Sequence, residues 1–391
     1  MIQKTSDVEP DNFIRFSRPQ QPADNMRTLW FEPERDALVV IDQTLLPHHL
    51  QLQTIDSLAA TCHAIVSMQV RGAPLIGIVA AFGVYFSLRN DSDSLDQACA
   101  QLLATRPTAV NLQWALQRVR DTLSDTAPAM QVPAALALAQ QLLSEDAAAC
   151  GQIGDHGLDI LEQLYQRKCQ QEGERAVLNI LTHCNAGWLA TGAWGTALAP
   201  IYKAHLAGMP VHVWVDETRP RNQGASLTAW ELARSGVPHT LIADNAGGHL
   251  MQHGMVDICL VGSDRTTANG DVCNKIGTYL KALAAFDNQV PFYAALPVST
   301  IDFSLEDGVR QIPIEQRDAS ELTHLLGRDV NGKMHRVQIT PDDTVVSNYG
   351  FDVTPARLVT GLITERGIFP ASVEGLSAIQ AQLRDTQAVV A

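Results

Sequence analysis

The second half of the chain, from about residue 175, contains short apolar runs that alternate with loops and helical stretches. The runs cover residues 176–181, 211–215, 239–242, 256–261 and 290–296, and each is followed by a polar or glycine-rich turn. Continuous apolar strands separated by helices indicate a parallel sheet covered on both faces. Such sheets bind ligands beyond the carboxyl ends of their strands. We therefore predict a Rossmann-like doubly wound α/β domain over residues 173–391, with its site just after the runs.

The first half of the chain has a different pattern. Residues 29–31 and 38–41 are β-prone and flank a charged turn, whereas residues 54–170 are dominated by Ala, Leu and Gln without strand-like alternation. This predicts a helical N-terminal domain with a small β element over residues 26–172. Residues 1–25 lack the apolar segment of a signal peptide and are interpreted as an N-terminal extension. No uninterrupted apolar run is long enough to span a bilayer, so no membrane partner is expected.

Charge and cysteine usage narrow the classes of function. The formal net charge of -14 disfavours nucleic acid as a partner and means that an anionic substrate must meet a local cluster of donors. The 7 cysteines are scattered and include no C-x-x-C pair, which argues against a disulfide framework and a structural zinc site and favours the cytoplasm. The glycine fingerprints of dinucleotide-binding and P-loop proteins are also missing after the candidate strands.

Cys184 and Asp264 are the candidate acid–base residues because each follows an apolar run. A helical stretch is predicted from Trp188, and its dipole would lower the pKa of the Cys184 thiol. The alternative is a buried inert cysteine. Partial burial of Asp264 would raise its pKa and keep it protonated at neutral pH. The alternative for Asp264 is a capping role or an ion pair with Arg265.

Two further segments offer polar groups beside this pair. Asn274 and Lys275 are expected near the start of a helix, where an amide, an ammonium and helix N–H groups make a phosphate site. The alternative is that Lys275 is a solvated surface lysine. The polar loop at 216–224 is either a binding loop or a helix-capping loop, and it lacks a histidine at ligand spacing, so no metal is expected there.

One segment of the helical half suggests an anion clamp. Arg71 offers a planar fork, Gly72 allows close approach of the backbone to a ligand, and Pro74 suits the first turn of a helix. Arg106 repeats the arrangement of a cation beside a proline at a helix start. A simple helix-hairpin turn is the alternative interpretation.

Taken in order, the motifs of the chain resemble the methylthioribose-1-phosphate isomerase family. That family is grouped with the regulatory subunits of initiation factor 2B and with archaeal ribose-1,5-bisphosphate isomerases. The resemblance runs from about residue 26 to residue 369. The matching motifs are I-D-Q-T-L-L-P at 41–47, R-G-A-P at 71–74, R-P-T-A-V-N-L at 106–112, H-C-N at 183–185, D-E-T-R-P at 216–220, Q-G at 223–224, G-S-D-R at 262–265, N-G-D at 269–271, N-K-I-G at 274–277 and F-D-V-T-P at 351–355.

The resemblance implies a reaction and a set of roles. It implies an aldose–ketose isomerase that converts 5-methylthioribose 1-phosphate to 5-methylthioribulose 1-phosphate in methionine salvage, without a cofactor and as a homodimer. Cys184 and Asp264 would carry the chemistry, by either an enolate or a hydride route. The substrate contacts would be Arg71, Gly72, Ala73, Arg106, Gln223, Asn274 and Lys275.

The chain departs from the family pattern at two places. The usual N-P-A-F-D-V-T-P reads N-Y-G-F-D-V-T-P at residues 348–355, and Cys273 stands beside Asn274. These changes bear on the C5 substituent of the substrate more than on the reaction. Three alternatives therefore accompany the main interpretation: a sister isomerase for 5-deoxyribose 1-phosphate or ribose 1,5-bisphosphate, a non-catalytic regulatory subunit, and a nucleotide-binding dehydrogenase.

Overall fold

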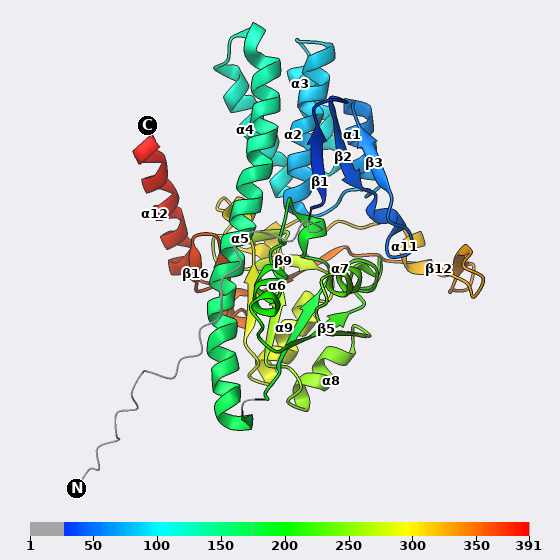
Figure 1. The fold of residues 1–391 in the computed structure, drawn as a ribbon, viewed down its shortest axis with the longest axis vertical. Helices are drawn as coiled ribbons and strands as arrows, with labels where there is room; N and C mark the ends of the chain where they lie inside the picture. The colour runs from blue at the N-terminus through cyan, green and yellow to red at the C-terminus, as the bar shows by residue number, and fades with distance from the viewer. Residues whose placement is uncertain (1–26, 174, 391) are drawn as a thin grey trace.

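The computed structural model describes residues 27–173 and 175–390, with the backbone alone for 386–390 (Figure 1). The predicted N-terminal extension, residues 1–25, lies outside the described residues. Within them, a helical part joins a part built on a parallel sheet. The mixed α/β class predicted from the sequence is thus confirmed.

The helical part begins with a three-stranded antiparallel sheet in the order β1-β2-β3, which confirms the β-prone runs near residues 29 and 38. Ser57 caps the first helix by accepting a hydrogen bond from the Ala60 N–H. The bounds of these elements are β1 (Leu29–Glu32), β2 (Ala37–Ile41), β3 (Leu52–Ile55), α1 (Leu58–Val66), α2 (Ala73–Asn90), α3 (Leu95–Thr105), α4 (Val110–Ser124) and α5 (Gln131–Glu172).

Helix α2 is the centre of the helical part. Of the residues described, it alone forms a helix long and apolar enough to cross a membrane, which the sequence analysis did not expect. However, 78% of this segment is buried inside the protein, where α1, α3, α4 and α5 pack around it. Such burial is typical of the core helix of a soluble protein.

The larger sheet of the described residues has seven strands in the order β16-β15-β10-β7-β4-β5-β6. The six strands from β15 to β6 are parallel, and their order is that of a doubly wound sheet. All five apolar runs predicted as strands lie in it. The bounds are β4 (Leu178–His183), β5 (Val211–Asp216), β6 (His239–Ile242), β7 (Ile258–Val261), β10 (Phe292–Ala295), β15 (Gly361–Thr364) and β16 (Gly367–Phe369).

Side chains from the two faces of this sheet enter different cores. Leu178 and Ile180 of β4 pack on one side with α5 and with α6 (Ala199–Leu206), whereas Leu181 packs on the other side. That other core also receives side chains from α8 (Ala246–Gln252), α9 (Thr278–Asp287) and α12 (Val373–Val390). Burial on both faces explains why the strands read as continuous apolar runs.

A second sheet of four strands, in the order β11-β8-β9-β14, lies beside the end of the parallel sheet. A β12–β13 hairpin projects from the body of the molecule (Figure 1). The sequence analysis predicted neither. The bounds are β8 (Arg265–Thr267), β9 (Val272–Lys275), β11 (Ile301–Asp302), β12 (His324–Arg328), β13 (Met334–Gln338) and β14 (Phe351–Thr354), and the short helices nearby are α7 (Ala229–Arg234), α10 (Gly308–Gln311) and α11 (Ser320–Thr323).

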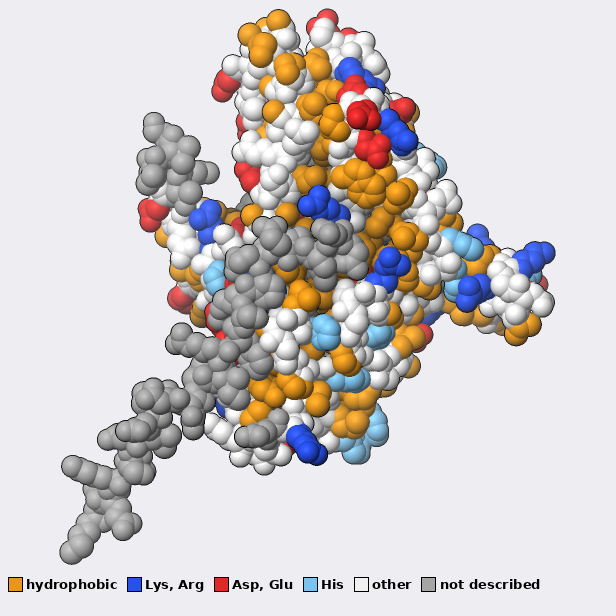
Figure 2. Space-filling model, in the orientation of Figure 1, with side chains coloured by type: hydrophobic (Ala, Val, Ile, Leu, Met, Phe, Trp, Pro, Cys, Tyr) orange, Lys and Arg blue, Asp and Glu red, His pale blue; other side chains and the backbone are white. Residues whose placement is uncertain are grey.

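Helix α5 runs along both parts of the molecule and joins them (Figure 1). It packs on α2 in the helical part and on α6 and β15 in the sheet part. It ends at Glu172, next to the predicted domain boundary at residues 172 and 173, which stays a prediction. The Arg and Lys side chains on the face in Figure 2 are scattered, apart from those of the hairpin at Arg328, Lys333 and Arg336.

Candidate active site

Cys184 lies directly after β4, at the carboxyl edge of the parallel sheet. Its backbone has a left-handed φ of 68° and is held by two threonines. The Cys184 N–H donates to Thr218 Oγ1 at 2.8 Å, and Thr228 Oγ1 donates to the Cys184 carbonyl at 2.6 Å. The thiol is buried and donates to Gln223 Oε1 at 3.6 Å, which brings Cys184 and Gln223 together as the resemblance implied.

The expected helix after Cys184 is not there, and the expected lowering of its pKa was wrong. The segment from Trp188 forms a short 3-10 turn, η3 (Trp188–Ala190), and α6 begins only at Ala199. Burial is the largest influence and raises the pKa of the Cys184 thiol, and Asp264 adds to the rise. The charges of Arg71 and Lys275 oppose it. The thiol therefore rests protonated beside two cations.

Asp264 follows β7 and reaches the same region. Burial raises the pKa of its carboxyl, as the sequence analysis predicted, while Lys275 and Arg71 oppose the rise. The suggested ion pair with Arg265 is not formed in the described structure. The Arg265 guanidinium instead lies 3.7 Å from Asp302 and donates to the Thr108 carbonyl at 2.7 Å. Asp264 is thus a carboxyl whose surroundings favour its protonated form.

Lys275 and Asn274 lie in β9 rather than at a helix start, because the chain pairs with β14 before α9 begins at Thr278. Both side chains are buried, so Lys275 is not the solvated lysine considered as an alternative. Its ammonium lies 4.7 Å from the centre of the Phe351 ring. Burial lowers the pKa of Lys275, whereas Cys184 and Asp264 would raise it when they are ionised.

Arg71 crosses from the helical part to the sheet part. Its two Nη groups donate to the side chain and to the carbonyl of Asn185, the latter at 2.8 Å. Asn185 Nδ2 in turn donates to Glu231 Oε1 at 2.8 Å, so that buried Glu231 supports the arginine through an amide. Burial raises the pKa of Glu231 to about 7, against hydrogen bonds from Asn185, Tyr202 and the Leu189 N–H and the charge of Arg71.

Gly72, Ala73, Arg106 and Asp264 line one narrow cavity of about 50 Å³. Gly72 caps α2 with a φ of 103°, and a Cβ added there would lie 2.5 Å from the Ala190 carbonyl. The glycine therefore permits contact between the two parts of the protein. Arg106 lies 3.4 Å from Glu315, and its buried Nε has no hydrogen-bond partner. Ligand pockets usually enclose ~300 Å³ or more, so this cavity is smaller than a typical ligand pocket.

A larger cleft of about 840 Å³ lies between α4, α5 and the segments around Val298 and Glu365. None of the predicted site residues lines it. Of the predicted residues, Arg71 and Lys275 each interact electrostatically with both Cys184 and Asp264, and Gln223 contacts the Cys184 thiol. The sequence analysis missed the supporting side chains Asn185 and Glu231, although Asn185 belongs to the H-C-N motif.

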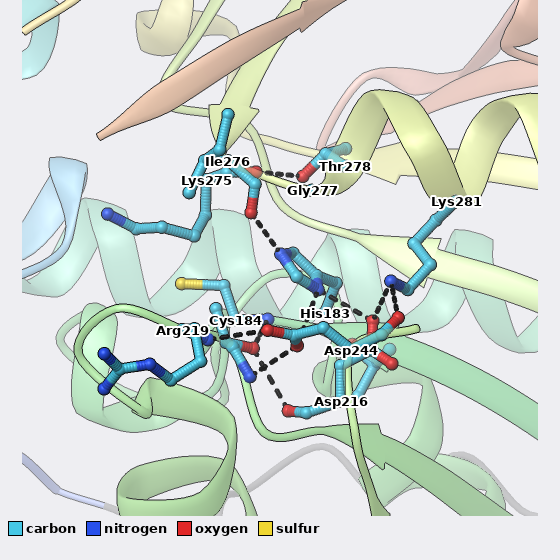
Figure 3. A network of polar contacts seen from close by, with 12 residues as sticks. His183, Cys184, Asp216, Arg219, Asp244, Lys275, Ile276, Gly277, Thr278 and Lys281 are labelled. Carbon is cyan, nitrogen blue, oxygen red and sulfur yellow. Dashed lines mark hydrogen bonds and ion pairs between the residues drawn. The ribbon is translucent and has the colours of Figure 1, made fainter. Parts of the chain in front are cut away.

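Behind Cys184 lies a buried polar network (Figure 3). His183 Nδ1 lies 2.7 Å from Asp216 Oδ2, and Lys281 Nζ lies 3.1 Å from the same carboxyl oxygen. His183, Asp216 and Asp244 are close enough to hold a metal ion. However, the Lys281 ammonium already occupies the cation position beside Asp216, and His183 Nδ1 is engaged with that carboxylate. This arrangement fits an ion-pair network better than a metal site.

A doubly wound sheet with a candidate acid–base pair after two of its strands, and two buried cations beside that pair, is typical of an enzyme that acts on a small molecule. The chain belongs to the initiation factor 2 subunit family, whose model matches residues 69–371. Within this family it is an isomerase, related to proteins named methylthioribose-1-phosphate isomerase. The relative from Rhodospirillum rubrum is 60% identical and covers 90% of this chain and 91% of its own. The relative from Escherichia coli O45:K1 is 55% identical, with 92% and 95% covered.

Solved structures show the same fold. A 5-methylthioribose 1-phosphate isomerase from Pyrococcus horikoshii OT3 has a TM-score of 0.78 and 36% identity, and covers 92% of this chain and 96% of its own. A translation initiation factor eIF-2B subunit delta from A. fulgidus has a TM-score of 0.71 and 34% identity, with 88% and 96% covered. The higher identity to the named isomerases favours the enzyme over the regulatory alternative.

Proposed function

We propose that the protein converts 5-methylthioribose 1-phosphate to 5-methylthioribulose 1-phosphate, as a cytoplasmic homodimer in methionine salvage. Relatives with that enzyme name at 55% identity or more support the reaction. The observation that carries the proposal is the arrangement of Cys184 and Asp264 around the two buried cations Arg71 and Lys275. An anionic sugar would occupy the place between these four groups.

The phosphate is expected near the start of α2. Arg71 and Lys275 are buried cations, and Arg106 has an unpaired buried Nε. The first N–H groups of α2 lie beside Gly72, which makes no side-chain cap. Cations and a free helix N-terminus together favour a phosphate, and binding it would neutralise the charge that their burial makes costly.

Asp264 is proposed as the general acid for ring opening. The C1 oxygen carries the phosphate, so the ring cannot open by the usual loss of a hydroxyl proton. A protonated Asp264 can instead deliver its proton to the ring oxygen as the bond from that oxygen to C1 breaks. Burial raises the pKa of Asp264, which favours the protonated form that this step needs.

The hydrogen on C2 must then reach C1, and two routes remain. In the enolate route, the minor thiolate form of Cys184 removes the C2 proton and the electrons form a C1–C2 double bond. The thiol then returns the proton to C1 while the C2 hydroxyl loses its proton to the Asp264 carboxylate, which leaves the C2 ketone. In the hydride route, the hydrogen moves with its electron pair to C1, and the C2 hydroxyl loses a proton to the Asp264 carboxylate. Deuterium on C2 separates them, because full retention at C1 in light water would contradict a freely exchanging base.

The substrate is tested by proton NMR of purified protein with 5-methylthioribose 1-phosphate. We expect the ketose product, and much slower turnover of the 5-deoxy and 5-phospho analogues measured in parallel. Faster turnover of an analogue would assign the protein to a related isomerase reaction. Tyr349, Gly350 and Cys273 would then be the residues to test for the choice of C5 substituent. Folded protein that turns over none of the three would contradict the proposal.

A further inference from the structure

The side chain of His183 lies between two hydrogen-bond acceptors. Its Nδ1 is 2.7 Å from the Asp216 carboxylate, and its Nε2 is 2.8 Å from the Ile276 carbonyl oxygen. Both His183 and Asp216 are buried. The positions of ring protons follow from the partners, and a carbonyl oxygen can only accept, so Nε2 carries a proton.

The second ring nitrogen, Nδ1, contacts a carboxylate oxygen that also contacts a lysine. Asp216 Oδ2 lies 2.7 Å from His183 Nδ1 and 3.1 Å from Lys281 Nζ. The buried contacts with Asp216 and Ile276 therefore hold the ring at both of its nitrogens.

Further ionisable groups lie around the ring. Besides Asp216 on β5 and Lys281 on α9, Asp244 after β6 lies 4.0 Å from His183 Nδ1, and Asp352 of β14 interacts electrostatically with His183. The two hydrogen bonds of the ring are the feature that matters for the site.

The two segments that His183 joins are those of the candidate catalytic thiol and of a candidate phosphate donor. Cys184 follows His183 directly in the chain, and Lys275 directly precedes Ile276. In Figure 3 the Cys184 sulfur and the Lys275 ammonium point to the same side of the network, with the His183 ring behind them. His183 also packs against Gly277, where an added Cβ would lie 3.0 Å from its Cε1.

We propose that His183 is a positioning residue that holds Cys184 and Lys275 beside one substrate through its two hydrogen bonds, to Asp216 and to the Ile276 carbonyl. This role deepens the proposed function, because it concerns the thiol and the ammonium of that site. The charge of Lys275 lowers the pKa of the Cys184 thiol. Loss of the link to Ile276 would let Lys275 move away, and the thiol would then ionise at higher pH.

The matched variants are His183→Asn and His183→Gln. An asparagine amide can take the place of Nδ1 but does not reach Ile276, whereas a glutamine amide can take the place of Nε2. The readout is the rate of Cys184 alkylation by iodoacetamide as a function of pH, followed by mass spectrometry of the peptide that contains Cys184. The alkylation measurement needs no substrate, so its result does not depend on whether the proposed reaction occurs.

We expect His183→Asn to move the alkylation midpoint upward by about 1 pH unit and to lower kcat by about 10²-fold, because a small displacement of reacting groups is costly. His183→Gln should recover part of both effects. The control His212→Gln, in a half-buried histidine that contacts Thr240, should change neither. A midpoint that stays unchanged while only thermal stability falls, or better recovery by Asn than by Gln, would overturn the proposal.

Discussion

The helical part and the sheet part contribute different kinds of group to the site. The helical part supplies Arg71, Gly72, Ala73 and Arg106, which all lie at or next to helix ends. The sheet part supplies the two ionisable groups that follow strands, Cys184 and Asp264. The N-terminal end of α2 offers N–H groups and a dipole for an anion, whereas a buried strand end offers a place where burial can shift a pKa. Arg106 lies at the carboxyl end of α3, not at the helix start expected from the sequence, and offers only its side chain. The difference suggests that the helical part mainly binds and the sheet part mainly reacts.

The division is not complete, because the sheet part also contributes a binding cation, Lys275. Moreover, Arg71 is held by Asn185, which lies in the sheet part. Each part thus depends on the other for the position of its charges. Substitutions that separate kcat from KM are the direct way to test the division.

The largest effect is expected for the sheet groups. Cys184→Ser and Asp264→Asn should each lower kcat by about 10³-fold or more, because they remove a proton-transfer group and leave the binding cations in place. Steady-state kinetics on folded variants, checked by circular dichroism, measures this. Turnover at the wild-type rate in either variant would remove that residue from the chemistry.

A smaller effect of a different kind is expected in the helical part. Arg71→Lys should raise KM by roughly 10-fold to 100-fold and change kcat less, since lysine cannot reproduce the two donations to Asn185 and the remaining contacts to an anion. The comparison of KM with kcat is the measurement. If kcat fell as far as in the Cys184 variant while KM stayed constant, the assignment of binding to this part would be wrong.

The smallest effect concerns the pH dependence of stability. Each part carries one carboxyl group whose pKa is raised in the folded protein. Burial raises the pKa of Asp146 on α5 from 3.8 to about 7 and that of Glu231 on α7 from 4.5 to about 7. The folded protein therefore holds these protons more tightly than the unfolded chain. Their contribution to stability is present below the unfolded pKa and is lost as the pH rises through about 7.

Asp146→Asn and Glu231→Gln should each flatten the fall of the unfolding free energy between about pH 4 and about pH 7. Urea denaturation across this range measures the slope for each variant and for the wild type. If only one substitution flattened the pH dependence of the unfolding free energy, only the carboxyl in that part of the molecule would bind a proton in this range. An unchanged slope in both would contradict the raised pKa values.

The sequence was most informative where local pattern and burial agree. The run at 256–261 contains β7, whose four residues are all buried because the parallel sheet is covered on both faces, and an apolar run is the direct consequence. The short strands β9 and β14 were missed. They are distant in the chain, as the pairing of Asn274 with Asp352 shows, and a local sequence pattern does not reveal such pairing.

The candidate site also has features that the sequence predicts and features that only the tertiary structure decides. The residue types after the strands and the order of the motifs are the basis on which the sequence predicts Cys184, Asp264 and the surrounding donors. The direction of the Cys184 pKa was decided only by tertiary structure, because it depends on burial and on Arg71 and Lys275. The same holds for the His183 link to Ile276, which joins residues 93 positions apart. Sequence specifies which groups are available, whereas distance and solvent exclusion, which determine their charges, exist only after folding.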